Sequence, residues 1–274
     1  MRFVVDTNQA SLLPIQERGG LKISLSPYVL AEILLRGNPE PTLQRLRPLD
    51  IRLGLEISDV LVELARLSPG EILEFEPFYV PGQHHRKNYE GILDALNGRR
   101  PEHLPWAQYI HDNHLEYCGS LVELSKRLRQ RLRDEGKGKS KISSFEEAFS
   151  GLASTPDSFL GSVIVGSITL DGARPAQAPP AELLEAVLAN QYVGRYFRMR
   201  LAYHLSISRG WADQQFNFDP SPERDDMTDI ALLLYAADGD IVVTADATLS
   251  TLIVLTEPEG RITVCRADQI PPPR

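Results

Sequence analysis

Phe3-Val4-Val5-Asp6-Thr7-Asn8 opens the chain, and Ile241-Val242-Val243-Thr244-Ala245-Asp246 lies near its end. Each segment is a short apolar strand that leads directly to a carboxylate. Strands rich in Val are normally buried in a parallel sheet, and open α/β sheets place ligands at the carboxyl edge of their strands. If the two strands are neighbours, Asp6 and Asp246 meet at that edge. Because crowded carboxylates repel each other unless they share a cation, the pattern predicts a metal site.

The segments around these strands predict an α/β fold. Residues 21–25 form a second apolar strand, and Ser26 and Pro27 then begin a helix over residues 28–36. Near the end of the chain we expect a helix at 227–237, strands at 241–244 and 261–265, and a short helix between these strands. The stretch between about residues 50 and 215 has mostly helical periodicity. The sequence therefore predicts one discontinuous domain over residues 1–274, with a core of 1–48 and 216–270 and a large, mainly helical insertion at about 50–215.

Composition limits the classes of function. The 274 residues include 29 basic and 37 acidic side chains, so the net charge of −8 argues against nonspecific coating of nucleic acid. The two cysteines, Cys118 and Cys265, are far apart and form no metal-binding motif. A reduced, cytoplasmic protein is the simplest interpretation, because neither a signal peptide nor a membrane-spanning run is recognisable.

Two further segments contribute acids. Glu32 lies among apolar residues of the predicted helix 28–36, where a carboxylate needs a partner or a cation. Asp226 and Asp229 are three residues apart at the start of the predicted helix 227–237, so they share one helix face. The neighbouring Asp225 is a weaker candidate for the same position. Together with the two strand tips, these residues form an ordered set of acids.

This order of acids resembles that of the PIN-domain family of metal-dependent nucleases. Its members open with an apolar strand that ends in Asp, often followed by Thr or Ser and then Asn. They carry a Glu in the helix after the second strand, a third acid at the start of a later helix, and Thr-x-Asp after the next strand. The matching residues here are Asp6 with Thr7 and Asn8, Glu32, Asp226 or Asp229, and Thr244 with Asp246. The resemblance covers about residues 1–37 and 224–265, and the long middle part has no counterpart in the usual PIN core.

The resemblance implies a three-layer α/β/α sandwich around a central, mostly parallel sheet. It also implies an endoribonuclease that hydrolyses single-stranded RNA with Mg²⁺ or Mn²⁺ and leaves 5′-phosphate and 3′-hydroxyl ends. Carboxylate oxygens suit these hard cations, and two ions about 3.5–4 Å apart can stabilise the attacking and the leaving oxygen. The metal ligands implied by the resemblance are Asp6, Glu32, Asp226, Asp229 and Asp246, which are also the expected catalytic residues. Asn8 and Thr244 would orient carboxylates or the scissile phosphate.

Other functions fit parts of the pattern. A PIN-like nuclease could act on DNA in a toxin or anti-phage system, and a PIN-like core could serve as a non-catalytic scaffold. Haloacid-dehalogenase-type phosphatases need a second Asp two residues after the first, where this chain has Asn8. Response-regulator receivers need an acid pair at the end of the first strand, and none lies beside Asp6.

A basic segment offers a surface for nucleic acid. Residues 126–141 contain eight Lys or Arg residues and two acids, and we expect RNA, rather than DNA, to be bound here. The expected binding residues are Lys126, Arg127, Arg129 and Arg133. The ordinary alternative is a solvated helix face. A second basic and aromatic segment surrounds Arg195, Arg198 and Arg200, for which an amphipathic helix is the favoured interpretation.

Two remaining expectations concern metals and partners. His111 and His114 have the spacing of a zinc-binding pair, but no further ligands follow at a recognisable interval, so a surface or capping role is favoured. A homodimer and a cognate antitoxin or other protein partner are both compatible with the resemblance, and the sequence does not choose between them. No membrane partner is expected.

Overall fold

The computed structural model describes residues 1–14, 21–82, 87–99, 104–134, 180–209, 224–257 and 260–270. The chain divides into two compact units. The first comprises residues 1–56, 77–117 and 232–274, and the second comprises residues 57–76 and 118–231. Helix α7 (Leu104–Asp134) contributes to both units. None of the described helices has the length and apolar character needed to cross a membrane.

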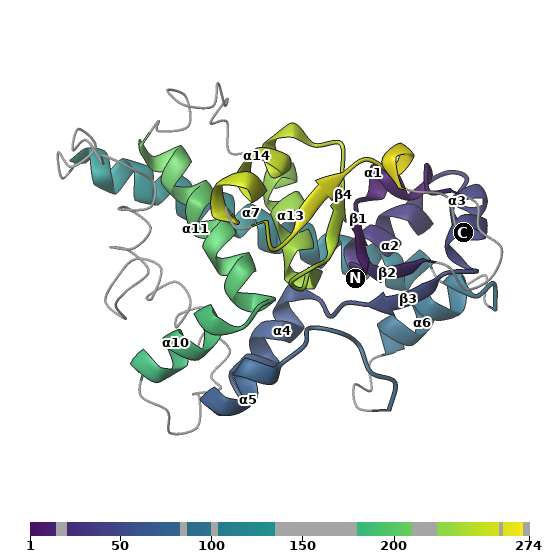
Figure 1. Ribbon diagram of the computed structural model, residues 1–274, viewed down its shortest axis with the longest axis horizontal. Coiled ribbons are helices and arrows are strands. Elements are labelled where there is room, and N and C mark those ends of the chain that lie inside the picture. The colour runs from purple at the N-terminus through teal and green to yellow at the C-terminus, as the bar shows by residue number, and fades with distance from the viewer. Residues whose placement is uncertain are drawn as a thin grey trace. The chain divides into compact units, whose positions relative to one another are not determined.

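A five-stranded, all-parallel sheet forms the centre of the first unit (Figure 1). Its order is β3-β2-β1-β4-β5. The strands are β1 (Phe3–Val5), β2 (Lys22–Leu25), β3 (Asp50–Leu53), β4 (Ile241–Val243) and β5 (Thr263–Cys265). Strand β1 pairs with β4 in the register Phe3↔Ile241 and Val5↔Val243. The two acid-tipped strands are therefore neighbours, and the expected α/β fold with a parallel sheet is confirmed.

Burial explains why these strands occupy the middle of the sheet. The side chains of Val4, Val5, Val242 and Val243 are fully buried. Strands covered on both faces contain almost only apolar residues, and β1 and β4 follow this rule. Since every strand runs in the same direction, the residues that follow β1, β2 and β4 lie at one edge of the sheet.

The helices of the first unit connect and cover these strands. They are α1 (Thr7–Ala10), α2 (Pro27–Leu35), α3 (Glu40–Leu46), α6 (Lys87–Leu96) and α14 (Ala247–Thr256), with short 3-10 helices η2 (Leu232–Tyr235) and η3 (Ala267–Gln269). Helix α2 packs against α1 and α6, and η2 packs against β1. The Ser26 hydroxyl accepts a hydrogen bond from Tyr28 N at 3.2 Å, so α2 begins where the sequence predicts.

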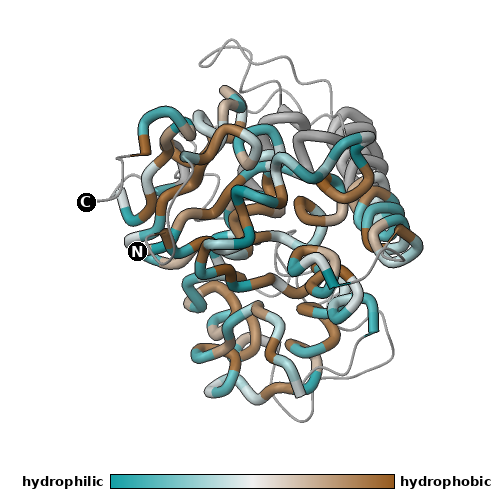
Figure 2. Tube along the Cα trace, turned by 90° about the vertical axis from the view of Figure 1, so that its right-hand side faces the viewer, coloured by the Kyte–Doolittle hydropathy of each residue, from teal (hydrophilic) through white to brown (hydrophobic). Residues whose placement is uncertain are grey.

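The second unit is helical in its described part. It contains α4 (Ile57–Leu64), α5 (Pro69–Glu74), α10 (Pro180–Ala189), α11 (Val193–Arg209) and α13 (Arg224–Ala231). Helix α4 buries Ile57, Val60, Leu61 and Leu64 along one face. Figure 2 shows that hydrophobic and hydrophilic residues alternate along helical segments of the chain. Helix α10 packs against α5 and α11, and α11 packs against α13.

Two elements differ from the sequence-based expectation. Strand β3 lies within the stretch expected to be mostly helical, and it pairs with β2 from Lys22↔Asp50 to Leu25↔Leu53. The expected helix at 227–237 is divided, since α13 ends at Ala231 and the chain continues as η2.

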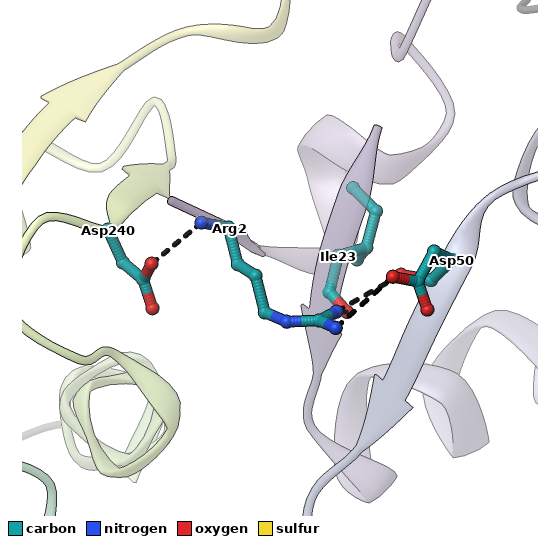
Figure 3. A network of polar contacts seen from close by, with 4 residues as sticks. All are labelled: Arg2, Ile23, Asp50 and Asp240. Atoms are coloured by element: carbon teal, nitrogen blue, oxygen red, sulfur yellow. Dashed lines mark hydrogen bonds and ion pairs between the residues drawn. The ribbon is translucent and has the colours of Figure 1, made fainter. Parts of the chain in front are cut away.

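Arg2 holds the amino edge of the sheet together (Figure 3). Its backbone N–H donates to Asp240 Oδ1 at 2.7 Å. Its guanidinium donates to the Ile23 carbonyl at 3.2 Å and to Asp50 Oδ2 at 3.2 Å. These contacts connect the starts of four strands, so the acids at this edge have structural partners. The carboxyl edge is organised differently.

Candidate functional site

Asp6 is fixed at the carboxyl edge of the sheet. Its backbone N–H donates to the Val243 carbonyl at 3.0 Å, which extends the pairing of β1 with β4 by one residue. The side chain is 8% exposed, and Asp6 Oδ2 accepts a hydrogen bond of 3.1 Å from the Thr244 hydroxyl. Asp6 is thus a buried carboxylate, and the side chain that donates to it is a neutral hydroxyl.

The Thr244 hydroxyl also contacts Asp246. Thr244 Oγ1 accepts a hydrogen bond of 3.0 Å from the backbone N–H of Asp246. Asp246 Oδ1 accepts from Leu249 N at 2.6 Å and so caps α14. No hydrogen bond to the second oxygen, Asp246 Oδ2, comes from any described residue. One hydroxyl therefore connects the two acids, and the half-buried Asp246 keeps an oxygen for a ligand.

Glu32 is the third acid at this edge. It lies on α2, and its Oε2 accepts a short hydrogen bond from the hydroxyl of Thr7, the residue after Asp6. Arg36, one helical turn after Glu32, places NH2 4.0 Å from Glu32 Oε1 and 3.3 Å from Asn8 Oδ1. The side chains that follow β1 and those of α2 thus form one polar cluster.

Burial disfavours the charged form of Asp6. Desolvation raises the pKa of its carboxyl, and the nearby negative charge of Glu32 acts in the same direction. Hydrogen bonds from Thr244 and from the backbone of Asn8 and Thr7 lower the pKa, but burial prevails. A cation beside Asp6 and Glu32 would offset the free-energy cost of charging the buried Asp6 carboxyl. Their oxygens are the ligand type that Mg²⁺ and Mn²⁺ prefer, so the acids fit such an ion.

Two of the predicted ligands lie in the other compact unit. Asp226 and Asp229 lie on α13, which belongs to the second unit, and the side chain of Asp226 lies outside the described part. Asp229 is half-buried there. Within the described residues, no group of three or more His, Cys, Asp or Glu side chains is arranged to hold a metal ion. The choice of a third or fourth ligand stays a prediction.

Only the backbone of the predicted nucleic-acid surface is described. Lys126, Arg127, Arg129 and Arg133 lie on the part of α7 that belongs to the second unit, and their side chains are outside the described part. Lys137, Lys139 and Lys141 also lie outside it. Arg195 and Arg200 are buried on α11, which agrees with the interpretation of this helix as a packing element.

The expected surface or capping role of the two α7 histidines is wrong for His114. His114 is buried, with its ring centroid 4.2 Å from that of Tyr28, while the His111 ring stacks on Tyr28 at 5.4 Å. Burial, with a contribution from His111, lowers the pKa of His114 to about 3. A neutral ring packed on an aromatic ring is a core contact.

Thr7 and Arg36 are the residues of the cluster whose contacts the sequence did not predict. Arg36 carries a usable signal, because it lies four residues after Glu32 and so shares its helix face. The Thr7 hydroxyl bond to Glu32 depends on how α1 and α2 pack. No pattern within either segment specifies that packing.

No family model, curated protein or solved structure matches the chain. Asp6, Glu32 and Asp246 lie at the edge where parallel sheets bind ligands. Neutral hydroxyls donate to the carboxylates of Asp6 and Glu32, and the backbone N–H of Leu249 donates to the carboxylate of Asp246. One weak contact to Arg36 supplies positive charge. The carboxylate oxygens of these acids are donors of the type that divalent cations prefer.

Proposed function

We propose that this chain is a divalent-metal-dependent nuclease with a PIN-like core, and that it cleaves single-stranded RNA endonucleolytically. The observation that carries the proposal is the double contact of Thr244, which donates to Asp6 and accepts from Asp246 N. It joins two acids from opposite ends of the sequence at the carboxyl edge of one sheet. The order of the acids along the chain, Asp6, Glu32 and Asp246, agrees with the family resemblance.

The metal-binding part of the proposal uses Asp6, Glu32 and Asp246, with Asp226 or Asp229 as an additional ligand. Mg²⁺ or Mn²⁺ is the expected cofactor, because all the donors are carboxylate oxygens. Divalent ions at such sites activate a water and neutralise charge on the leaving oxygen of a phosphodiester. The products would carry a 5′-phosphate and a 3′-hydroxyl.

The other residues of the cluster have supporting roles in this proposal. Thr244 orients Oδ2 of Asp6, and Thr7 orients Glu32 in the same way. Asn8 is exposed at the edge of the cluster, where its amide can contact either Arg36 or a phosphate. These fixed donors mean that the carboxylates need little reorganisation to bind an ion.

The proposal includes a three-layer α/β/α arrangement of the core and a helical insertion that controls access of the substrate. The parallel sheet and the helices around it support the first part. The basic residues of α7 are proposed to bind the RNA backbone. A homodimer and an antitoxin or other protein partner remain predictions of the same kind.

The direct test is cleavage of labelled single-stranded RNA in Mg²⁺ or Mn²⁺. We expect cleavage by the unmodified chain, and its loss in Asp6→Asn and Asp246→Asn. The matched control is Asp50→Asn, which makes the same change at the exposed amino edge and should leave cleavage unchanged. Metal-dependent cleavage that survives Asp6→Asn would contradict the proposal. Cleavage of single-stranded DNA in preference to RNA would favour the DNA-directed alternative.

A further inference from the structure

Arg36 has an unusual position in the cluster. It follows the last residue of α2, its side chain is 36% exposed, and one nitrogen, NH2, makes both of its contacts. That nitrogen lies 3.3 Å from Asn8 Oδ1 and 4.0 Å from Glu32 Oε1. The second separation is too long for a hydrogen bond. Asn8 therefore holds one corner of the guanidinium, and Glu32 attracts it only through charge.

Arg47 shows what a structural arginine looks like in the same unit. Its Nε donates to the Leu96 carbonyl at 2.7 Å, and NH1 and NH2 donate to the two oxygens of Glu40 at 2.6 and 3.1 Å. All three of its nitrogens are in use. For Arg36, by contrast, Nε and NH1 donate to no group of the described residues. Since Asn8 takes only one of the two NH2 hydrogens, one pair of parallel N–H donors, NH2 with NH1 or NH2 with Nε, stays open at an exposed edge.

The charge around Arg36 makes such donors useful. A nucleic-acid strand that reaches Asp6, Glu32 and Asp246 brings a negative phosphate toward three carboxylates. Metal ions bound by the acids would offset this repulsion at the scissile phosphate but not at the next one. A guanidinium can bind two phosphate oxygens at once, which gives both attraction and orientation.

We propose that Arg36 binds a phosphate of the nucleic-acid strand, next to the scissile one, through the pair of parallel N–H donors that Asn8 leaves open, while Asn8 holds one NH2 hydrogen. This inference rests on the proposed nuclease function and specifies how its substrate is held. Arg36 is a binding residue in this scheme, since it touches the strand and not the reacting atoms. The phosphate is common to RNA and DNA, so the contact does not itself select the sugar.

The test is binding of fluorescein-labelled single-stranded RNA by fluorescence anisotropy, in EDTA so that no cleavage occurs, over a range of salt concentrations. We expect Arg36→Ala to weaken binding about tenfold, the size of a lost hydrogen bond to a charged group. The slope of log K against log salt should fall by about 0.7, which corresponds to one lost phosphate contact on a single strand. Arg36→Lys should keep the salt slope and recover part of the affinity, because it keeps the charge without the fork.

Lys22→Ala is the matched control. Lys22 is exposed at the first position of β2, on the amino edge, so the variant loses the same charge far from the acids. Its affinity for RNA should stay within about twofold of the unmodified chain. Equal losses in Lys22→Ala and Arg36→Ala would mean that net charge alone is measured, and the proposal would fail. It would also fail if the unmodified chain bound no RNA.

Measuring RNA cleavage as well as binding then distinguishes the phosphate contact of Arg36 from the nuclease function on which it rests. If Arg36→Ala binds RNA normally and cleaves it slowly, Arg36 acts only on Glu32 and the inference is wrong. If the unmodified chain never cleaves RNA but Arg36→Ala still loses binding, the phosphate contact stands and the nuclease proposal fails. If cleavage occurs and Arg36→Ala raises KM with little change in kcat, both are supported.

Discussion

Thr244 Oγ1 lies 3.1 Å from Asp6 Oδ2, although the two residues are 238 positions apart in the sequence. The pairing of β1 with β4 brings them together, because Val5 is in register with Val243, the residue before Thr244. The same hydroxyl accepts from Asp246 N. Thr244 therefore has a donor and an acceptor role that no apolar residue of its shape can replace.

We predict that Thr244→Val destabilises the chain by about 1–3 kcal/mol, the usual cost of leaving buried polar groups without partners. Valine preserves the shape but leaves Asp6 Oδ2 without its donor and Asp246 N without its acceptor. Urea unfolding at neutral pH measures the change. The control is Thr251→Val, which removes a solvent-exposed hydroxyl bond to the Ala247 carbonyl and should change stability by less than about 0.5 kcal/mol.

Asp6 should make the chain less stable as pH rises. Its folded-state pKa is raised above the unfolded value of about 3.8, so the folded state binds more protons between these two values. The contribution of Asp6 to stability is then lost as pH rises from about 3.8 through the raised pKa. Asp6→Asn lacks this titration. We expect the unfolding free energy of Asp6→Asn, minus that of the unmodified chain, to increase over this window.

The measurement compares urea unfolding of the two chains, without metal, from acidic to neutral pH. Taking the difference between them cancels the titration of the other groups, which both chains share. A constant difference across the window would show that Asp6 titrates normally in the folded chain. A decrease with rising pH would show that its pKa is lowered, as a nearby cationic partner would cause.

Binding of a divalent metal should offset the free-energy cost of charging the buried Asp6 carboxyl. Ligands bind metal in their deprotonated form, so affinity for Mn²⁺ should increase with pH through the raised pKa of Asp6. Bound Mn²⁺ should also raise the melting temperature, because a ligand that binds only the folded state stabilises it. Titration calorimetry and thermal unfolding test both effects. We expect Asp6→Asn to lose them and Asp50→Asn to keep them. If the unmodified chain binds no Mn²⁺ at millimolar concentration, the scaffold alternative becomes the better interpretation.

The sequence predicts the centre of the sheet better than its periphery, for a physical reason. Strands β1 and β4 are buried on both faces, so their runs of Val are visible in any reading of the chain. Strand β3 is at the end of the sheet order, and it alternates Ile51 and Leu53 with the charged Asp50 and Arg52. Its four residues become a strand because β2 offers an edge to pair with, and that information is not local.

The same distinction applies to the candidate site. Acids at strand tips are recognisable because the backbone direction fixes where they lie, and this holds for Asp6 and Asp246. The Thr7 bond to Glu32 and the Arg36 contact to Asn8 depend on how α1 and α2 pack and on rotamers. The positions of Asp226 and Asp229 are harder still to predict from the sequence, because their helix α13 belongs to a different compact unit from β1. Their side-chain positions depend on contacts that no short motif encodes.

Asn190 gives a prediction for the second unit that does not depend on the proposed function. Its amide donates to the Ile72 carbonyl at 2.7 Å and to the Phe75 carbonyl at 2.8 Å. Its Oδ1 accepts from the backbone N–H groups of Tyr192 and Val193, both at 2.9 Å. One buried side chain thus joins the end of α5 to the turn between α10 and α11. A longer contact of 3.4 Å reaches the Leu73 carbonyl, so Asn190→Ala would remove five hydrogen bonds to backbone groups.

We expect Asn190→Ala to lower the free energy of unfolding by about 2–4 kcal/mol, because several buried polar groups lose their hydrogen bonds together. Asn190→Asp should recover only the acceptor contacts. The control is Asn97→Ala, which removes one exposed bond to the Leu93 carbonyl and should have an effect of less than about 0.5 kcal/mol. Urea unfolding provides the comparison, with RNA binding measured alongside. Equal, small effects of both alanine variants would mean that the junction of α5 with α10 and α11 is held by apolar packing, and that the Asn190 network contributes little.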